Sequence, residues 1–325
     1  MSLVNPYRRY ASKKLAVVLI LIGTYLILPI IFRGEYTYRV LTYLALFTVF
    51  SMFFSLLYGK TNQLFLCIAA LAGISAYTSG LLTINFGLNV WAAFIIGPLT
   101  SAGTAALLSY ITNITRLGAI YIGVVTLAFQ MIFETMVTGL VSITGGETGF
   151  RPPRLPLDPI YGVLGESLTF YYLSVTVAII AVLLIYFLYE KSRFGLLMEA
   201  IRQEELAAEI LGINTKLIKI FTAALAGFFI GVAGLIYGNY NQLISPVFFS
   251  FFSIDILSQV MAVAGSNGTV VGPVVGAIVV IFLNEYIRFL GPISLSVYGL
   301  LLVILFSTFR NGIVLFIRRW IPWLP

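Results

Sequence analysis

The chain has 325 residues, of which 60% are apolar and 10% charged, and it carries a formal net charge of +7. Soluble globular proteins contain about 25% charged residues, so this composition excludes a protein covered by a water-facing surface and predicts an integral membrane protein. There is no histidine and Cys67 is the single cysteine, which excludes a disulfide within the chain, a Cys/His metal site and catalysis by serine-histidine or cysteine-histidine pairs.

Apolar runs of roughly 20 residues recur along the chain, and each is long enough to cross a hydrocarbon core as a helix. They predict an all-α, polytopic bundle of about ten membrane-spanning helices that forms one domain over residues 1–325. The segment near 250–276 contains Asp255 and several glycines, so it is expected to be either a full crossing or a broken or re-entrant segment. The expected spans are 15–32, 39–58, 64–83, 90–111, 118–139, 169–189, 217–238, 250–265, 270–288 and 293–309.

Basic residues predict the orientation of these spans. With the amino terminus inside, 14 of the 19 Lys and Arg residues fall on the cytoplasmic side, as the positive-inside rule expects. Both termini are therefore expected in the cytoplasm, with residues 140–168 forming an outer loop and residues 190–216 an inner one. The same asymmetry accounts for the positive charge of the chain without a nucleic-acid partner.

The second span ends in "YGKT", Tyr58–Thr61, which resembles the end of a nucleotide-binding loop. Such a loop requires a glycine five residues before its final glycine, where this chain has Phe54, and it links a strand to a helix. The motif is therefore rejected, and no ATPase is expected in this chain. Asn62 and Gln63 come next, at the inner start of the third span, as polar residues that either line a pathway or cap a helix at the interface.

The inner loop holds four of the twelve acidic residues between Ser192 and Ile213. No Pro or Gly interrupts residues 196–211, so one amphipathic helix is predicted, ended by Gly212 and followed by Asn214 as the cap of the next span. Its apolar side is expected to contain Leu197, Ile201, Ala208 and Leu211. The alternatives are packing on its own membrane domain, lying on lipid, or docking into a groove of a partner; the excess of acidic residues argues against anionic lipid.

Two glycine-rich stretches follow. "AGFFIGVAGLIYG" places Gly227, Gly231, Gly234 and Gly238 at the spacing that lets membrane helices approach closely. "AGSNGTVVGPVVGA" contains Gly265 and Gly268 and predicts either a tight hairpin or a helix break whose backbone amides face a pathway.

Several segments resemble one family in the same order along the chain. "EAIRQEELAAEILGI" (Glu199–Ile213) is similar to the "EAA" coupling loop of ATP-binding-cassette importer permeases, and "SRFG" before it to the branched-chain amino acid permease group of the LivM type. Further similar segments are "YGKTNQLFLCIAALAGISAY", "LGAIYIGVVTLAF", "TGGETGF", "SPVFFSFFSIDIL", "GSNGTVVGPVVGA" and "FSTFRNGIVL". The resemblance covers most of the chain.

This resemblance implies a permease subunit of an importer in the inner membrane, carrying branched-chain amino acids, with urea or a short amide as the alternative cargo. It implies no cofactor on this chain, because ATP and Mg would bind a separate nucleotide-binding ATPase subunit. Further implied partners are a second permease subunit, an extracytoplasmic substrate-binding protein and membrane lipid. The residues expected to couple to the ATPase are Arg193, Glu199, Ala200, Arg202, Ala207, Ala208 and Gly212.

For the substrate pathway, Glu134 and Asp255 are the carboxylates placed to meet a substrate ammonium group, although an outer vestibule would also solvate Glu134. The other pathway candidates are Gln63, Gly145, Gly146, Gly265 and Gly268. An ion-coupled secondary transporter or a channel is the competing class, and it would need no ATPase.

The chain departs from the family pattern at four places. Asn62 stands for a usual Gly, Cys67-Ile68 for Gly-His, Gly265-Ser266 for Gly-Gly, and Asn311 for a terminal Pro. These departures leave the transporter class intact and put the exact substrate in doubt.

Overall fold

The computed structural model describes residues 34–188 and 192–293 without a gap, together with 23–25, 27–29, 297, 299–301, 303, 307 and 312–318. Over these residues the protein is all-α, as predicted, and the only strand-like pairing is an antiparallel bridge between Phe150 and Ile244. Within this described part, six helices are long and apolar enough to cross a membrane: α2 (Glu35–Thr61), α3 (Ile68–Phe86), α4 (Val90–Ile114), α5 (Ala119–Gly139), α8 (Glu166–Tyr186) and α11 (Thr215–Tyr240).

Shorter elements complete the described chain. They are α6 (Val141–Thr144), η1 (Gly146–Thr148), α7 (Asp158–Leu164), α9 (Arg193–Gln203), α10 (Glu205–Ile210), η3 (Phe251–Asp255), α12 (Ile256–Gly265), α13 (Gly272–Ile287), η4 (Arg288–Ile293) and α15 (Ile313–Arg318). The predicted count of ten spans is not reached within the described residues, because α12 and α13 are shorter apolar helices. The predicted spans 15–32 and 293–309 lie largely outside the described residues.

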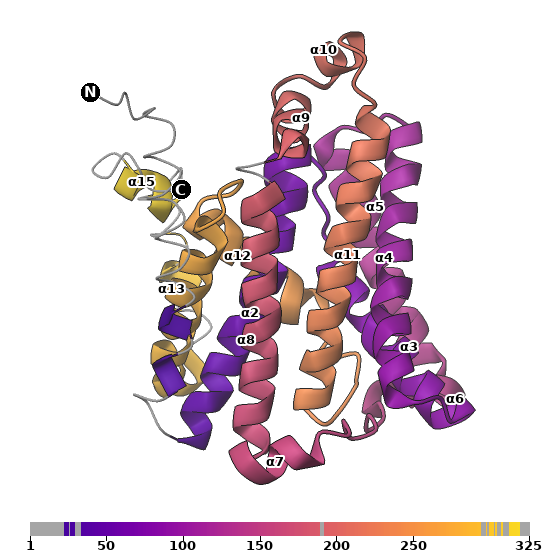
Figure 1. Ribbon diagram of the computed structural model, residues 1–325, viewed down its shortest axis with the longest axis vertical. Helices are drawn as coiled ribbons and strands as arrows, with labels where there is room; N and C mark the ends of the chain where they lie inside the picture. The colour runs from indigo at the N-terminus through magenta and orange to yellow at the C-terminus, as the bar shows by residue number, and fades with distance from the viewer. Residues whose placement is uncertain are drawn as a thin grey trace, which may run out of the picture.

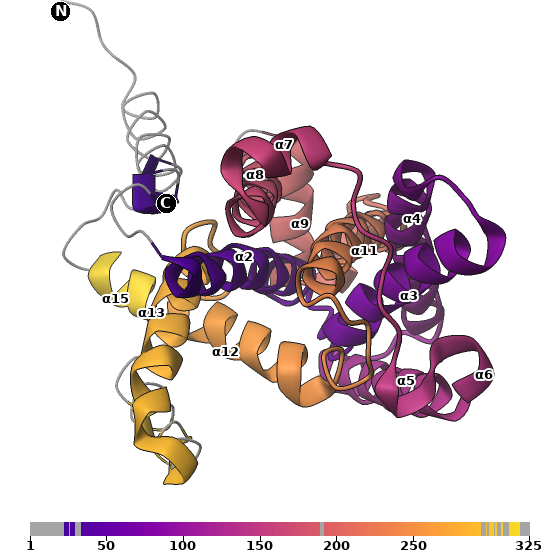
Figure 2. The ribbon, with the colours of Figure 1, turned by 90° about the horizontal axis from the view of Figure 1, so that it is seen from below.

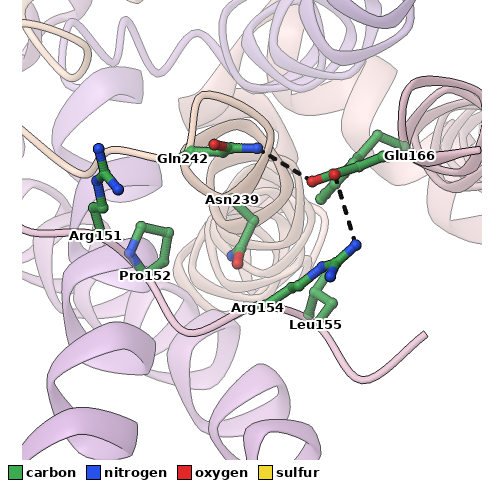
Figure 3. Close-up of a pocket in the computed structure, with 8 residues that line it drawn as sticks. Arg151, Pro152, Arg154, Leu155, Glu166, Asn239 and Gln242 are labelled. Carbon is green, nitrogen blue, oxygen red and sulfur yellow. Dashed lines mark hydrogen bonds and ion pairs between the residues drawn. The ribbon is translucent and has the colours of Figure 1, made fainter. Parts of the chain in front are cut away.

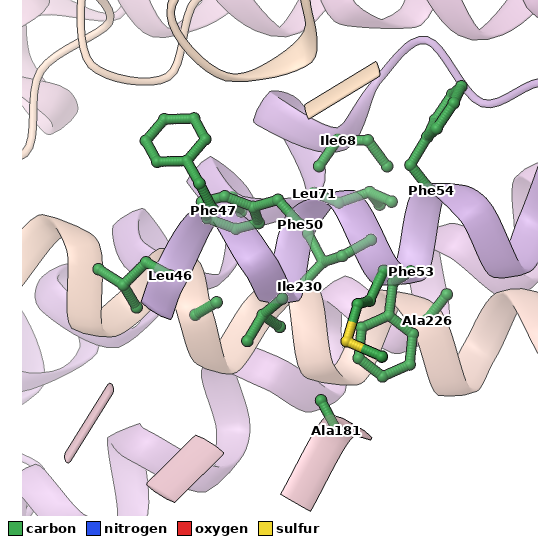
Figure 4. Close-up of a cluster of buried hydrophobic side chains, with 14 of the residues drawn as sticks. Leu46, Phe47, Phe50, Phe53, Phe54, Ile68, Leu71, Ala181, Ala226 and Ile230 are labelled. Carbon is green, nitrogen blue, oxygen red and sulfur yellow. The ribbon is translucent and has the colours of Figure 1, made fainter. Parts of the chain in front are cut away.

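The helix α2 is the axis of the bundle. Its apolar side chains point in all directions, as expected for a helix surrounded by other helices, and α8, α11, α12 and α13 all pack against it. Figure 4 shows part of this core, with Phe47, Phe50, Phe53 and Phe54 of α2 among its labelled side chains. The ring of Phe53 also stacks on that of Phe229 in α11, at 5.0 Å between centroids. The core therefore forms around the candidate span that is most completely buried among its neighbours.

The glycines of α11 are packing glycines, as predicted. A Cβ atom on Gly234 would lie 2.5 Å from the Cα of Ala72 in α3, and one on Gly231 would lie 2.9 Å from the Cα of Pro98 in α4. The hydroxyl of Ser101 in α4 donates to the carbonyl of Gly227 at 2.8 Å. Small side chains thus let α3, α4 and α11 approach one another at backbone distance.

Two segments depart from the regular α-helix. Residues 62–67 connect α2 and α3 as an extended segment without helix, and Gln63, Phe65 and Cys67 within it are completely buried. The second departure is η3, five residues of π-helix that run directly into α12, so Phe251–Gly265 is one short apolar helix. The segment near 250–276 is therefore not broken at its start, and residues 266–271 form the turn of a hairpin between α12 and α13.

The two long loops lie at opposite ends of the bundle, as Figure 1 shows. The insert with α9 and α10 stands above one end, and α6 and α7 lie at the other. Seen along the bundle in Figure 2, α5 and α12 follow one lateral edge, whereas α4, α8 and α9 lie on the other side of α2 and α11.

Candidate functional site

The acidic insert is built from two helices, and the prediction of a single one is wrong. The helix α9 ends at Gln203, Glu204 is extended (φ −157°, ψ 106°), and α10 follows. Neither Gly nor Pro marks this break. The terminator at Gly212 (φ +84°) and the cap at Asn214, which accepts from the backbone N–H of Leu217 at 3.1 Å, are as predicted.

Three carboxylates tie the insert to the ends of the membrane helices. Lys60 at the end of α2 pairs with Glu199 at 2.9 Å, and Lys219 in the first turns of α11 pairs with Glu205 at 2.6 Å. Arg116, between α4 and α5, lies 4.0 Å from Glu209. Each of these acids reaches a different membrane helix or its loop, so the charges explain how the insert is held in register above the bundle.

The pKa of Glu199 reflects this docking. Partial burial acts to raise the pKa, but the hydrogen bond from Lys60 and the charges of Lys60 and Arg202 outweigh it, so the pKa lies below its usual value. The carboxylate therefore stays ionised at neutral pH. A further contact of the same joint is the Asn62 side chain, which donates to the carbonyl of Arg202 at 3.1 Å.

The apolar residues of the insert divide into two sets. Met198, Ile201 and Ala208 are buried against the membrane domain, whereas Leu211, predicted for the same side, is 79% exposed. Ile210 is 86% exposed, and the other large exposed side chains are those of Leu196 and Leu206. The α10 end thus presents apolar side chains beyond the acids that anchor it.

The residues predicted to couple to an ATPase are therefore not one surface. Arg193, Arg202, Ala207 and Gly212 are exposed, Ala200 and Glu199 are half-buried, and Ala208 packs inward. Sequence reasoning missed Leu206 and Ile210, whose signal is an apolar pair four residues apart on the side opposite to Ala208.

A second polar site lies where α3 begins inside the bundle. Asp255 is completely buried, and its two carboxylate oxygens accept the backbone N–H groups of Ile68 at 2.6 Å and Ala69 at 3.1 Å. The next N–H, of Ala70, donates to the side-chain oxygen of Gln130 at 2.6 Å. These are the first donors of a helix, which have no partner in the helix itself. Asp255 is thus committed to holding the start of α3.

The helix α5 supplies a ladder of polar side chains to this junction. The Thr126 hydroxyl accepts from the N–H of Leu66 at 3.0 Å, and the Gln130 amide donates to the carbonyl of Phe249 at 3.0 Å. Glu134 accepts from the Phe251 N–H at 2.7 Å and from the Gln130 amide at 2.8 Å. These residues recur every fourth position and so share one face of α5. Sequence reasoning missed Thr126, although the four-residue spacing from Gln130 and Glu134 indicates that it lies on the same face.

Gln63 is also fully engaged. Its amide donates to the Thr61 hydroxyl at 3.0 Å and to the carbonyl of Lys219 at 3.2 Å, and its oxygen accepts from Ser109 at 2.6 Å. It therefore joins α2, α4 and α11 from a completely buried position. Since Lys219 also pairs with Glu205, the insert and the extended 62–67 segment are neighbours.

The glycines predicted for the pathway lie in two tight backbone contacts. Gly145 and Gly146 have positive φ (75° and 61°) in the turn before Phe150, whose backbone pairs with Ile244. A Cβ atom on Gly265 would lie 1.7 Å from the carbonyl oxygen of Gly272, inside the α12–α13 hairpin. The structure brings neither set together with Glu134 or Asp255 in a shared contact.

Two of the four departures from the family pattern fall at left-handed backbone positions. Asn62 (φ +54°) ends α2, and Ser266 (φ +119°) ends α12. Glycine adopts such conformations without strain, and asparagine does so more readily than other residues. Cys67 and Ile68 stand at the start of α3, and Asn311 lies outside the described residues.

At the α6–α7 end, a pocket of about 330 Å³ opens between α8, α11 and the 140–168 loop. Figure 3 shows the side chains of Arg151, Arg154, Glu166 and Gln242 around it. Glu166 accepts from Gln242 at 3.2 Å and pairs with Arg154 at 3.7 Å. The α6–α7 end of the bundle therefore offers a charged, partly open surface.

Comparison with known proteins gives the following similarities. A family model described as "Branched-chain amino acid transport system / permease component" matches residues 36–306. The chain is 23% identical over 301 residues to the high-affinity branched-chain amino acid transport system permease protein LivM of Escherichia coli (strain K12), covering 86% of this chain and 70% of that protein. It is 23% identical over 279 residues to LivM of Salmonella typhimurium, covering 79% and 64%.

Shorter similarities reach permeases named for another cargo. The chain is 26% identical over 132 residues to the ribose import permease protein RbsC of Haemophilus influenzae, which is 39% of each chain. It is 28% identical over 164 residues to RbsC of Bacillus subtilis, covering 45% of this chain and 51% of that protein. No solved structure matches.

Proposed function

We propose that this chain imports branched-chain amino acids with energy supplied by a separate ATPase subunit. The chain belongs to the family of branched-chain amino acid transport system permease components. It is thus a multi-pass membrane permease of the ATP-binding-cassette class. The similarity to LivM proteins over most of the chain supports this cargo. The similarity to ribose permeases makes a sugar the second candidate.

The observation that carries the proposal is the exposed apolar end of α10. Ile210 ends α10 and Leu211 follows it, and both side chains are largely exposed on an insert that three ion pairs hold in place, one from α9 and two from α10. Burial of such side chains in a groove is favourable by about 25 cal/mol per Å² of apolar surface removed from water. In our proposal this end is cytoplasmic and enters a groove of the ATPase.

The ion pairs give this docking a mechanical consequence. A displacement of α10 by the ATPase reaches Lys219 through Glu205, and the carbonyl of Lys219 holds Gln63 in the extended segment. Coupling of this kind requires the docked element to take different positions in two global states. The outer loop 140–168, with the pocket beside it, would face the extracytoplasmic substrate-binding protein, and a second permease subunit would complete the pathway.

Reconstitution tests the proposal. Liposomes are prepared that contain the chain, the ATPase and the other transporter subunits. Uptake of labelled leucine, ribose and urea is then measured with and without ATP on the side of the membrane where the ATPase lies. We expect ATP-dependent uptake of leucine in excess of ribose and urea. Uptake without any ATPase would support a secondary transporter instead, and uptake of ribose in place of leucine would support the sugar.

A further inference from the structure

The carboxylates Glu134 and Asp255 have opposite environments although they lie in the same polar junction. Asp255 is completely buried, and both of its oxygens accept backbone N–H groups. Glu134 is partly exposed, and both of its hydrogen bonds end on a single oxygen, Oε1. Its second oxygen, Oε2, therefore retains its capacity to accept.

No cation neutralises Glu134 within the described part of the chain, where none of the ion pairs includes it. A carboxylate in a membrane helix costs about 2.5–3.5 kcal/mol at the centre of the bilayer and less toward its surface. A half-exposed and unpaired carboxylate on α5 is thus poorly suited to face lipid. The side chain instead requires water or a cationic group.

The surroundings of Glu134 are polar on the chain's lateral edge. The N–H of Phe251 that fixes Glu134 belongs to the first residue of the π-helix η3, and single turns of π-helix are frequent at functional sites. The hydroxyls of Ser250 and Ser253 flank it and bond to each other at 2.8 Å. Neither serine is buried, and α5 and α12 run along this edge in Figure 2.

We propose that Glu134 lines the translocation pathway and that its Oε2 binds the ammonium group of the amino acid, with Ser250 and Ser253 beside it, whereas Asp255 only positions the start of α3. This inference rests on the proposed function, since it assigns a contact for an amino-acid cargo. A charge-assisted hydrogen bond in a site with little water is the interaction that would hold an ammonium group there.

Glu134→Gln separates this role from a structural one. The amide oxygen of glutamine keeps both hydrogen bonds of Oε1 and removes the charge, so a purely structural Glu134 predicts unchanged transport. We expect kcat/KM for leucine uptake by the reconstituted transporter to fall by about tenfold or more, with subunit assembly unchanged. Glu35→Gln, at an exposed carboxylate in the first turn of α2, is the matched control and should transport normally.

A labelling measurement supplies a readout independent of activity. Cys67 is completely buried, so Glu134→Cys provides the reactive thiol for a membrane-impermeant methanethiosulfonate. We expect the reagent to label the assembled transporter at this position, because the proposal places residue 134 in a water-accessible pathway. Wild-type leucine transport combined with normal transport by Glu134→Gln, or with no labelling of Glu134→Cys, would overturn the inference and leave the proposed function standing; absence of leucine uptake by the wild-type transporter would instead defeat the proposed function.

Discussion

The junction around Asp255 buries polar groups inside the bundle, whereas the insert around α10 exposes apolar side chains. At the junction, deep in an apolar body, Asp255 and Gln130 satisfy the backbone donors of a helix that begins inside the bundle. In the insert, above the bundle, acidic side chains form ion pairs that anchor it, whereas Ile210 and Leu211 stay exposed. The junction satisfies its polar groups within the chain, whereas in our proposal a partner covers the exposed side chains of the insert. Changes at the first should therefore impair folding, and changes at the second should impair assembly.

The largest expected effect comes from Asp255→Ala, which breaks the junction. Two buried N–H groups lose their acceptors, and each such loss costs about 1–3 kcal/mol. We expect a lower free energy of unfolding, measured by denaturant titration in detergent micelles. Asp158→Ala, which removes an exposed carboxylate from α7, should change it by less than about 0.5 kcal/mol. Equal effects of the two substitutions would refute the capping role.

Gly234→Ala sharpens the same side of the comparison. The new methyl group would lie 2.5 Å from the backbone of Ala72, and overpacking of this kind costs about 1–3 kcal/mol. The measurement is thermal unfolding in detergent. Gly103→Ala in α4 is the control, because a Cβ atom there meets nothing within 4 Å, and it should leave the melting temperature unchanged or raise it.

Ile210→Ser addresses the other side. We expect the permease to fold and melt normally but to bind the ATPase with about 5-fold to 30-fold lower affinity, as for a central apolar contact worth about 1–2 kcal/mol. Binding is measured by titrating labelled ATPase into permease held in nanodiscs. Val163→Ser, at a side chain 83% exposed on α7, is the matched control at the opposite end. Reduced ATPase affinity in the control as well would show that the effect is not local.

The smallest effect is expected at the Lys60–Glu199 pair. Because the pKa of Glu199 is lowered, the pair contributes stability above the ordinary pKa of glutamate and loses it as the pH falls through the lowered value. Docking of α9, followed by hydrogen exchange of its backbone amides, should therefore not change between about pH 6 and 8. Glu199→Gln should cost only about 0.2–1 kcal/mol because the pair is partly exposed. Restoration of protection by exchanging the charges, Lys60→Glu with Glu199→Lys, would identify the pair as the cause.

The sequence predicted the long helices well because their apolar runs end where polar or glycine residues begin. The span predicted at 90–111 is observed as Val90–Ile114, and that at 118–139 as Ala119–Gly139. The predicted spans 39–58 and 64–83 leave residues 62 and 63 in a connection, but residues 64–67 were wrongly placed in a helix, because their apolar side chains fit a helix equally well. Acceptors from α5 and η3, distant along the chain, make the extended path possible.

The candidate sites follow the same division. The sequence predicted the acidic insert and its terminator Gly212. It also gave Glu134 as a candidate contact for a substrate ammonium group, which stays a prediction. The break at Glu204 was not predicted, because no local signal competes with helix there and tertiary ion pairs hold the two helices separately. The different roles of Glu134 and Asp255 also depend on partners that only the fold brings together.

Cross-linking from position 210 tests the central claim most directly. Ile210→Cys, in a chain whose own cysteine is buried, is assembled with the ATPase and treated with a short bifunctional thiol-amine reagent. Our account predicts a covalent product of permease and ATPase that Val163→Cys does not give. A cross-link from position 163 and none from position 210 would contradict it.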